Sequence, residues 1–107
     1  MAVTQDRVFR ALADPTRRAL LERLLRDGEC TVVELTGAAR VSQPAVSKHL
    51  KLLRVAGLVR HRPEGRTVRY RAEPRALLGV AEWLRLYTGF WEDRFDRLEA
   101  LLQRMDT

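Results

Sequence analysis

The side chains best suited to chemistry are concentrated between positions 42 and 51, in the stretch SQPAVSKHLK. Val46, Leu50 and Leu53 recur there at spacings of four and three residues, which predicts a helix with one buried face. The other face carries hydroxyl, amide and ammonium groups. An amide can pair with an adenine edge, and ammonium groups neutralise phosphates. We therefore expect contacts to nucleic acid from Ser42, Gln43, Pro44, Ser47, Lys48 and Lys51.

Two further residues, His49 and Cys30, could be reactive. His49 can contact a base or a phosphate. Helical geometry also places it beside Val46 and Leu53, so packing on the inner side of the helix is an equal alternative. Cys30 is the only cysteine, which excludes an internal disulfide and fits a reducing cytoplasm. We expect Cys30 to be a small buried residue, with a disulfide between subunits as the alternative.

Catalytic patterns are missing from the sequence. It has no glycine-rich phosphate loop and no nucleophile with a base beside it. Ser42 and Ser47 flank His49, but their helix positions suit capping and contact rather than a catalytic triad. The sequence therefore predicts neither an enzyme nor a cofactor.

The net charge of +6 arises in the middle of the chain. Residues 40–71 contain nine basic side chains and one acidic side chain, residues 1–39 are balanced, and residues 72–107 carry a net charge of −2. Concentrated positive charge is what a polyphosphate partner requires. A solvated basic surface and a patch for acidic lipids are the alternatives, so charge alone favours nucleic acid only modestly.

Capping residues predict four helices in the first half of the chain. An Asp-Pro pair can begin a helix, a Gly can end one, and a Thr followed three positions later by Glu forms a capping box. These signals predict helices from about residue 4, from Asp14-Pro15 to Asp27-Gly28, from Thr31 with Glu34 to residues 37–39, and from Ser42 to Gly57. The short connection around residues 39–41 makes the last two a helix-turn-helix, whose second helix would enter the major groove.

A basic β-hairpin is predicted directly after the fourth helix. Its strands run from Leu58 to Arg62 and from Arg66 to Arg71, with a turn at residues 63–65. Alternation along the second strand places Val68 and Tyr70 on one side and arginines on the other. An isolated two-stranded hairpin is only marginally stable in water, so this hairpin must pack on the helices. It would reach the DNA backbone or the minor groove through Arg62, Arg66 and Arg69.

Residues 74–105 are predicted to be mostly helical, starting at Pro74. Two apolar series with a period of seven, offset by four, form a packing seam over four heptads. Gly89 lies inside the seam and can kink or split the helix. The aromatic residues could line a ligand pocket, but a dimer core is the stronger interpretation. We expect a homodimer that packs through Leu77, Leu84, Trp91, Phe95, Leu98 and Leu102.

Three separated stretches, in the right order, resemble the ArsR/SmtB family of prokaryotic regulators. Residues 42–59 are similar to its recognition helix, residues 11–18 to its second-helix entry, and residues 62–70 to its wing. The resemblance covers about residues 6–74. It implies a mainly α, α+β winged helix-turn-helix fold with a long C-terminal dimerisation helix. It also implies a homodimeric repressor that binds an inverted repeat in double-stranded DNA, with Gln43, Ser47, Lys48 and His49 facing the bases.

The chain departs from the family pattern at the metal sites. Many relatives sense metals through a Cys-x-Cys pair in the third helix, where this chain has Thr31 and Val33. A zinc or arsenite site needs about three or four ligands, so Cys30 alone is a poor one. A second family site would require histidines in the last helix, but residues 75–107 contain none. We predict no metal, and the sequence leaves the inducer open.

One domain is expected, with the DNA-binding core and wing in residues 4–73 and the dimerisation helix in residues 74–107. No run of about 18 apolar residues and no secretory signal is present, so we expect a cytoplasmic protein without a membrane partner. The alternative function is a protein–protein module in which DNA binding is lost. The basic helix and hairpin favour DNA.

Overall fold

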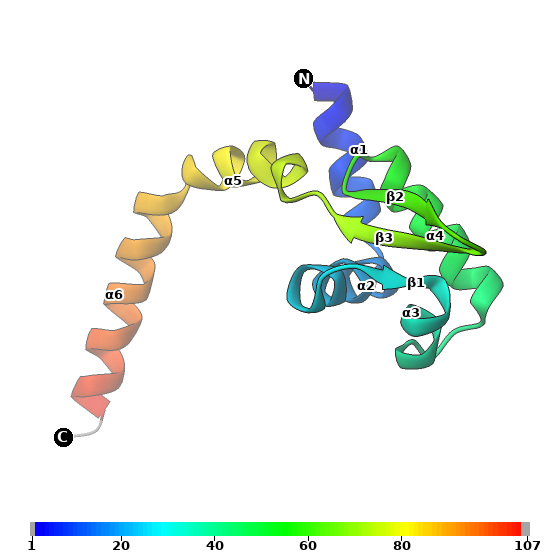
Figure 1. The fold of residues 1–107 in the computed structure, drawn as a ribbon. Coiled ribbons are helices and arrows are strands. Elements are labelled where there is room, and N and C mark those ends of the chain that lie inside the picture. The colour runs from blue at the N-terminus through cyan, green and yellow to red at the C-terminus, as the bar shows by residue number, and fades with distance from the viewer. Residues whose placement is uncertain (1, 106–107) are drawn as a thin grey trace.

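The computed structural model describes residues 2–105, which form six α-helices, a short 3₁₀ helix and a three-stranded sheet. Helices α1 to α4 gather beside the sheet, and α6 extends away from this body (Figure 1). No helix in these residues is long and apolar enough to cross a membrane. In chain order the elements are α1 (Ala2–Leu12), α2 (Pro15–Asp27), β1 (Cys30–Thr31), α3 (Val32–Ala38), α4 (Gln43–Val55), β2 (Val59–Glu64), β3 (Thr67–Ala72), η1 (Pro74–Leu77), α5 (Leu78–Arg85) and α6 (Thr88–Met105).

The predicted capping residues begin α2, α3 and α4. The Asp14 carboxylate accepts a hydrogen bond from the backbone N–H of Arg17 at 2.9 Å. Thr31 and Glu34 form the capping box of α3, and the Ser42 hydroxyl accepts from the third residue of α4. Each bond satisfies an amide that the first turn of a helix leaves free. The starts of these three helices were therefore predicted from local sequence.

One hydrophobic core joins the first four helices to the sheet. Val46, Leu50 and Leu53 are fully buried, which confirms the apolar face of α4. Leu35 of α3 and Leu58, just before β2, are fully buried beside them. Burial of one such side chain contributes about 1.5–3 kcal/mol. This apolar line holds α4 against the body and leaves the opposite face to solvent.

The sheet has one strand more than predicted. Two strands were expected, but β1 pairs antiparallel with β3, so that the order is β1-β3-β2. A two-residue strand followed at once by a helix has too little alternation to be found from sequence. The turn expected at residues 63–65 is shifted to residues 65–66, because Pro63 and Glu64 belong to β2. Proline is tolerated there because β2 is an edge strand and can lack one donor.

The C-terminal segment is divided into a 3₁₀ helix and two α-helices. The helix ends before Leu86 and resumes at Thr88, so Gly89 is not the breaking point. The backbone N–H groups of Leu86 and Tyr87 donate to carbonyls three residues earlier, at 3.3 and 3.0 Å. These tight turns interrupt the α-helical ladder. The seam predicted over four heptads is consequently split into two parts. One part lies on η1 and α5, and the other lies on α6.

Candidate nucleic-acid interface

The solvent side of α4 presents the polar residues predicted to contact DNA. We call Gln43, Pro44, Ser47, Lys48 and Lys51 the recognition face, and all five are exposed. Val46, Leu50 and Leu53 anchor the opposite side. Neither lysine forms an ion pair within residues 2–105, so both ammonium groups are available to phosphates.

Ser42 lies at the N-terminal end of this face and is occupied as a helix cap. Its hydroxyl oxygen accepts from the backbone N–H of Ala45 at 3.3 Å. The hydroxyl hydrogen is left to donate to another acceptor. The remaining amides of the first turn add partial positive charge at the end of the helix that would enter a groove.

His49 is turned toward α2, away from the recognition face. Its Nδ1 lies 3.5 Å from a guanidinium nitrogen of Arg17 and 3.9 Å from a carboxylate oxygen of Asp14. Its side chain is only 21% exposed. Of the two alternatives for His49, this geometry favours packing over contact with a base.

Arg17 ties this histidine to the end of α1. Its guanidinium donates to the carbonyl oxygens of Ala11 at 2.7 Å and Arg10 at 3.1 Å, which the last turn of α1 would otherwise leave free. The hydrogen bond from the backbone of Arg17, opposed by desolvation and aided by the nearby His49, lowers the pKa of Asp14. The orientation of α4 is thus coupled to the corner between α1 and α2.

The hairpin formed by β2 and β3 is the wing, and its three predicted DNA contacts differ in their surroundings. Arg62 donates to both carboxylate oxygens of Glu29, at 3.2 and 2.9 Å. Arg69 forms a short ion pair with Glu64. Arg66, at the tip, has no carboxylate partner within residues 2–105. Two of the three arginines are therefore already paired.

Sequence reasoning missed the residues that hold the wing to the body. Arg54 of α4 places a guanidinium nitrogen 2.7 Å from Nε2 of His61 on β2. Arg60 pairs with Glu73 at 3.0 Å across the base of the wing itself. Glu29 lies 33 residues from Arg62 in the chain, so no local pattern predicts that pair. Charged residues at alternate positions of β2, at Arg60, Arg62 and Glu64, indicate only that these side chains share a face.

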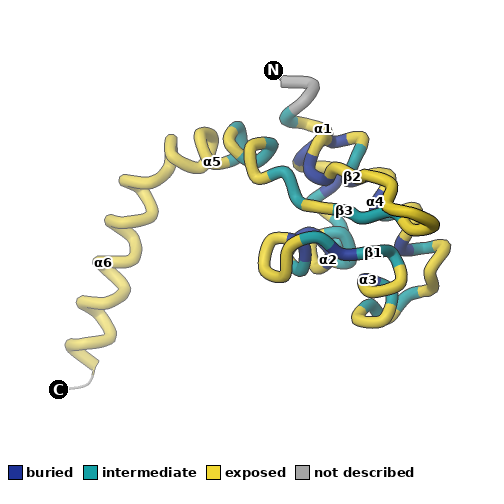
Figure 2. Tube along the Cα trace, viewed as in Figure 1, coloured by how far each residue is buried: buried dark blue, intermediate teal, exposed yellow. Residues whose placement is uncertain are grey.

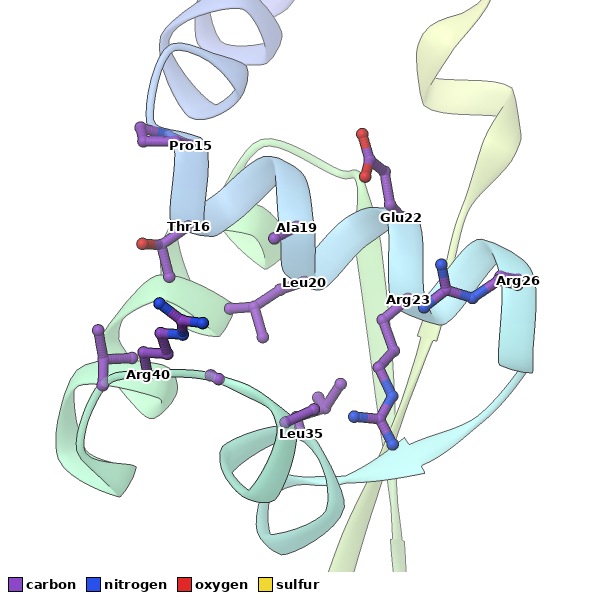
Figure 3. A pocket seen from close by; sticks show the side chains of 12 residues that line it. Pro15, Thr16, Ala19, Leu20, Glu22, Arg23, Arg26, Leu35 and Arg40 are labelled. Carbon is purple, nitrogen blue, oxygen red and sulfur yellow. The ribbon is translucent and has the colours of Figure 1, made fainter.

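A groove of about 500 Å³ runs between α2 and the turn that joins α3 to α4. Leu20 and Leu35 line its apolar part, and Arg40 reaches from the turn toward α2 (Figure 3). Arg23 lies at the other end, paired with Asp27. No buried side-chain polar atom in the described part of the chain lacks a partner.

Cys30 is 3% exposed, which confirms the expectation of a buried thiol. Burial raises its pKa, so the reactive thiolate is disfavoured. Within residues 2–105, no group of three or more His, Cys, Asp or Glu side chains could hold a metal ion.

The residues predicted at the dimer interface fall into two environments. Leu77 is half-buried and packs against the core of its own chain. The other five, on α5 and α6, are exposed, and Figure 2 shows α6 exposed along its length. Exposed apolar surface of this extent is typical of an interaction site. The five residues are Leu84, Trp91, Phe95, Leu98 and Leu102.

Comparison with known proteins agrees with this geometry. A sequence model described as bacterial regulatory protein, arsR family, matches residues 14–61. The chain is 44% identical to the HTH-type transcriptional regulator Rv2034 of Mycobacterium tuberculosis, covering 79% of this chain and 83% of that protein. It is 32% identical to the arsenical resistance operon repressor of Escherichia coli, covering 92% and 81%.

Solved structures show the same similarity. The crystal structure of the ArsR family transcriptional regulator RHA00566 superposes with a TM-score of 0.76 at 36% identity, covering 86% of this chain and 94% of that one. An ArsR-like transcriptional regulator from Rhodococcus sp. RHA1 gives a TM-score of 0.72 at 32% identity, covering 94% and 93%.

Proposed function

Because this chain belongs to the arsR family of bacterial regulatory proteins, it is a DNA-binding transcriptional regulator and not an enzyme, and we propose that it acts as a homodimeric repressor of an inverted-repeat operator. The observation that carries this proposal is the recognition face of α4. It combines unpaired ammonium groups and an exposed amide on a helix whose other side is anchored in the core.

We assign roles to the recognition face by its chemistry. The Gln43 amide, with one donor and one acceptor side, suits the edge of an adenine. Ser47 can reach either a base or a phosphate, and Lys48 and Lys51 suit phosphates. Arg66 at the wing tip would contact the backbone or the minor groove. His49 is better placed to orient α4 than to contact a base.

The dimer is proposed from the apolar face that one chain leaves uncovered. Trp91, Phe95 and Leu98 are each at least half exposed on α6. A second copy related by a two-fold axis can cover such a self-complementary surface. Two recognition helices related by that axis would favour an operator with inverted half-sites. A transcriptional regulator acts at the site of the DNA that it binds, so we propose that this protein is cytoplasmic.

We propose that the releasing signal is not a metal. Cys30 is the only thiol and is buried, and residues 75–107 contain no histidine. A zinc or arsenite site needs about three or four ligands in one place, and for these metals thiolate or imidazole groups usually supply most of them. Zinc titration tests this proposal directly. Stoichiometric tight binding that also weakens DNA affinity would refute it.

Selection of bound fragments from the source genome is the decisive experiment for the proposed function. We expect an inverted repeat upstream of a specific operon, and affinity for it that falls steeply with salt because phosphate contacts release counterions. Failure to enrich any sequence would refute sequence-specific binding. Enrichment of single half-sites, together with a monomeric protein, would refute the dimeric arrangement.

A further inference from the structure

Carboxylates interrupt the basic outer face of the wing. Arg62 and Arg69 stand opposite each other in the β2–β3 ladder, and Arg69 stands opposite Thr31 of β1. Residues directly opposite in a sheet share a face, and so do residues two apart along a strand. The two arginines therefore lie side by side on the outer face. Glu29, two residues before Thr31, reaches Arg62 there.

Both arginines are engaged by these carboxylates. Arg62 makes a two-point contact with Glu29 and lies 4.0 Å from an oxygen of Glu64, while Arg69 pairs closely with Glu64. The Arg62 hydrogen bond lowers the pKa of Glu29, and the Glu64 hydrogen bond raises the pKa of Arg69. The two carboxylates relieve the repulsion between neighbouring guanidinium groups.

The consequence for DNA binding follows from competition for the same guanidinium groups. An arginine that neutralises a phosphate must leave its carboxylate, which then stands close to the polyanion without a counter-charge. Arg66 and Lys48 face no such competition within residues 2–105. Phosphate contacts are sequence-independent, so this competition weakens binding to every duplex alike.

We propose that Glu29 and Glu64 are restraining residues that hold Arg62 and Arg69 on the protein surface and thereby keep the sequence-independent part of DNA binding weak. This inference rests on the proposed DNA-binding function. It changes the roles expected from sequence, because two of the three wing arginines then belong to an internal charge network. The tip residue Arg66 is left as the principal wing contact.

The test compares Glu29→Gln and Glu64→Gln with Glu22→Gln. Glu22 is exposed on α2 and has no ion pair within residues 2–105, so this control removes the same charge without releasing an arginine. Fluorescence anisotropy of the full chain is measured with the selected operator and with a scrambled duplex of equal length, from about 50 to 200 mM salt. Glutamine keeps an acceptor oxygen and a similar volume, and circular dichroism checks the fold.

We expect each wing variant to bind both duplexes about two- to fivefold more tightly than Glu22→Gln, with a salt slope steeper by about one. The increase is the same for operator and scrambled DNA, because phosphates are identical in both. Equal affinity of Glu29→Gln and Glu22→Gln, or weaker binding by both wing variants, would overturn the inference. A wild-type protein with no preference for the operator would instead refute the proposed function.

A coupling measurement separates release of an arginine from a general effect of charge. Arg62→Gln is made in the wild type and in the Glu29→Gln variant. We expect it to leave the salt slope unchanged in the wild type, where Arg62 makes no phosphate contact, and to remove the steeper slope in the variant. An equal fall of the salt slope in both backgrounds would show that Arg62 contacts DNA regardless of Glu29, and would overturn the inference. If Glu29→Gln does not fold, Glu64→Gln with Arg69→Gln makes the same measurement.

Discussion

At the scale of single residues, the basic groups near the proposed interface differ in whether a carboxylate already pairs with them. Lys48 and Arg66 have no such partner within residues 2–105, whereas Arg62 and Arg69 do. A free ammonium or guanidinium group gives up only water when it meets a phosphate. The distribution of ion pairs is therefore a better guide to DNA contact than the count of basic residues.

This difference predicts the effect of alanine substitutions. Lys48→Ala and Arg66→Ala should each weaken DNA binding about threefold at moderate salt and reduce the salt slope by about one. Arg97→Ala, in the middle of α6 where Arg97 pairs with Asp93, removes the same charge and should leave affinity unchanged. Titration of a labelled duplex measures all three. Wild-type affinity in both Lys48→Ala and Arg66→Ala would mean that DNA binds elsewhere on the protein.

Asp14 predicts a defined pH dependence of stability. Its folded-state pKa is lowered below the ordinary value of an aspartate, chiefly by the backbone hydrogen bond from Arg17. The ionised group therefore stabilises the fold above that value, and this contribution is lost as pH falls through the lowered pKa. Asp14→Asn keeps a capping acceptor but does not titrate. Urea unfolding at several pH values measures the difference in stability between wild type and variant, which should shrink below about pH 4. A difference that does not depend on pH would contradict this account.

At the scale of elements, α4 is held by burial on one side and by its two ends. Ser42 begins it, and Gly57 follows it with φ of 80°, a left-handed conformation that leads the chain into β2. A Cβ at Gly57 would meet nothing within 4 Å, so only the backbone conformation demands glycine there. The direction in which the wing leaves α4 therefore depends on one backbone conformation.

Two glycine substitutions test this dependence with opposite signs. Gly57→Ala should destabilise the protein by about 1 kcal/mol or more because alanine is strained at this φ. Gly37 lies inside α3 with no positive φ and open space around it, so Gly37→Ala should be neutral or stabilise by up to about 1 kcal/mol. Thermal and urea denaturation measure both. Similar losses in the two variants would rule out φ as the cause.

At the scale of the whole molecule, the chain has a packed body and an uncovered C-terminal arm. The body has its own core from α1 to β3, to which η1 and α5 are joined through Leu77, Val80 and a 2.7 Å hydrogen bond from Gln5 to the Gly79 carbonyl. Beyond Tyr87, α6 exposes its apolar residues along its length (Figure 2). This arrangement favours a molecule completed by a second copy.

The proposed dimer predicts how single charges on α6 will act. Leu98→Glu places a carboxylate in the proposed seam and should shift the protein toward monomer at micromolar concentration, with a parallel loss of operator affinity. Gln103→Glu adds the same charge outside the two apolar series and should leave the dimer intact. Analytical ultracentrifugation measures both. A wild-type monomer, or a Leu98→Glu variant as dimeric as wild type, would contradict the proposed seam.

The sequence by itself determined the limits of α2, α3 and α4, the inner face of α4 and the family. These features depend on interactions within about four residues, such as a cap at Asp14 or the spacing of Val46 and Leu50, and on patterns visible along the chain. The family match over residues 14–61 falls where those patterns are strongest. The same locality explains why the sequence predicted which polar residues of α4 are exposed, with His49 left open.

Only the tertiary structure decided what happens between distant elements. It added β1 to the sheet, moved the C-terminal break to Leu86, turned His49 toward α2 and paired Arg62 with Glu29. Each outcome depends on how elements pack and on the register in which strands meet, which local spacing does not encode. The positive charge of residues 40–71 was evident from sequence, but which arginines remain free to meet DNA depends on carboxylates that folding brings beside them.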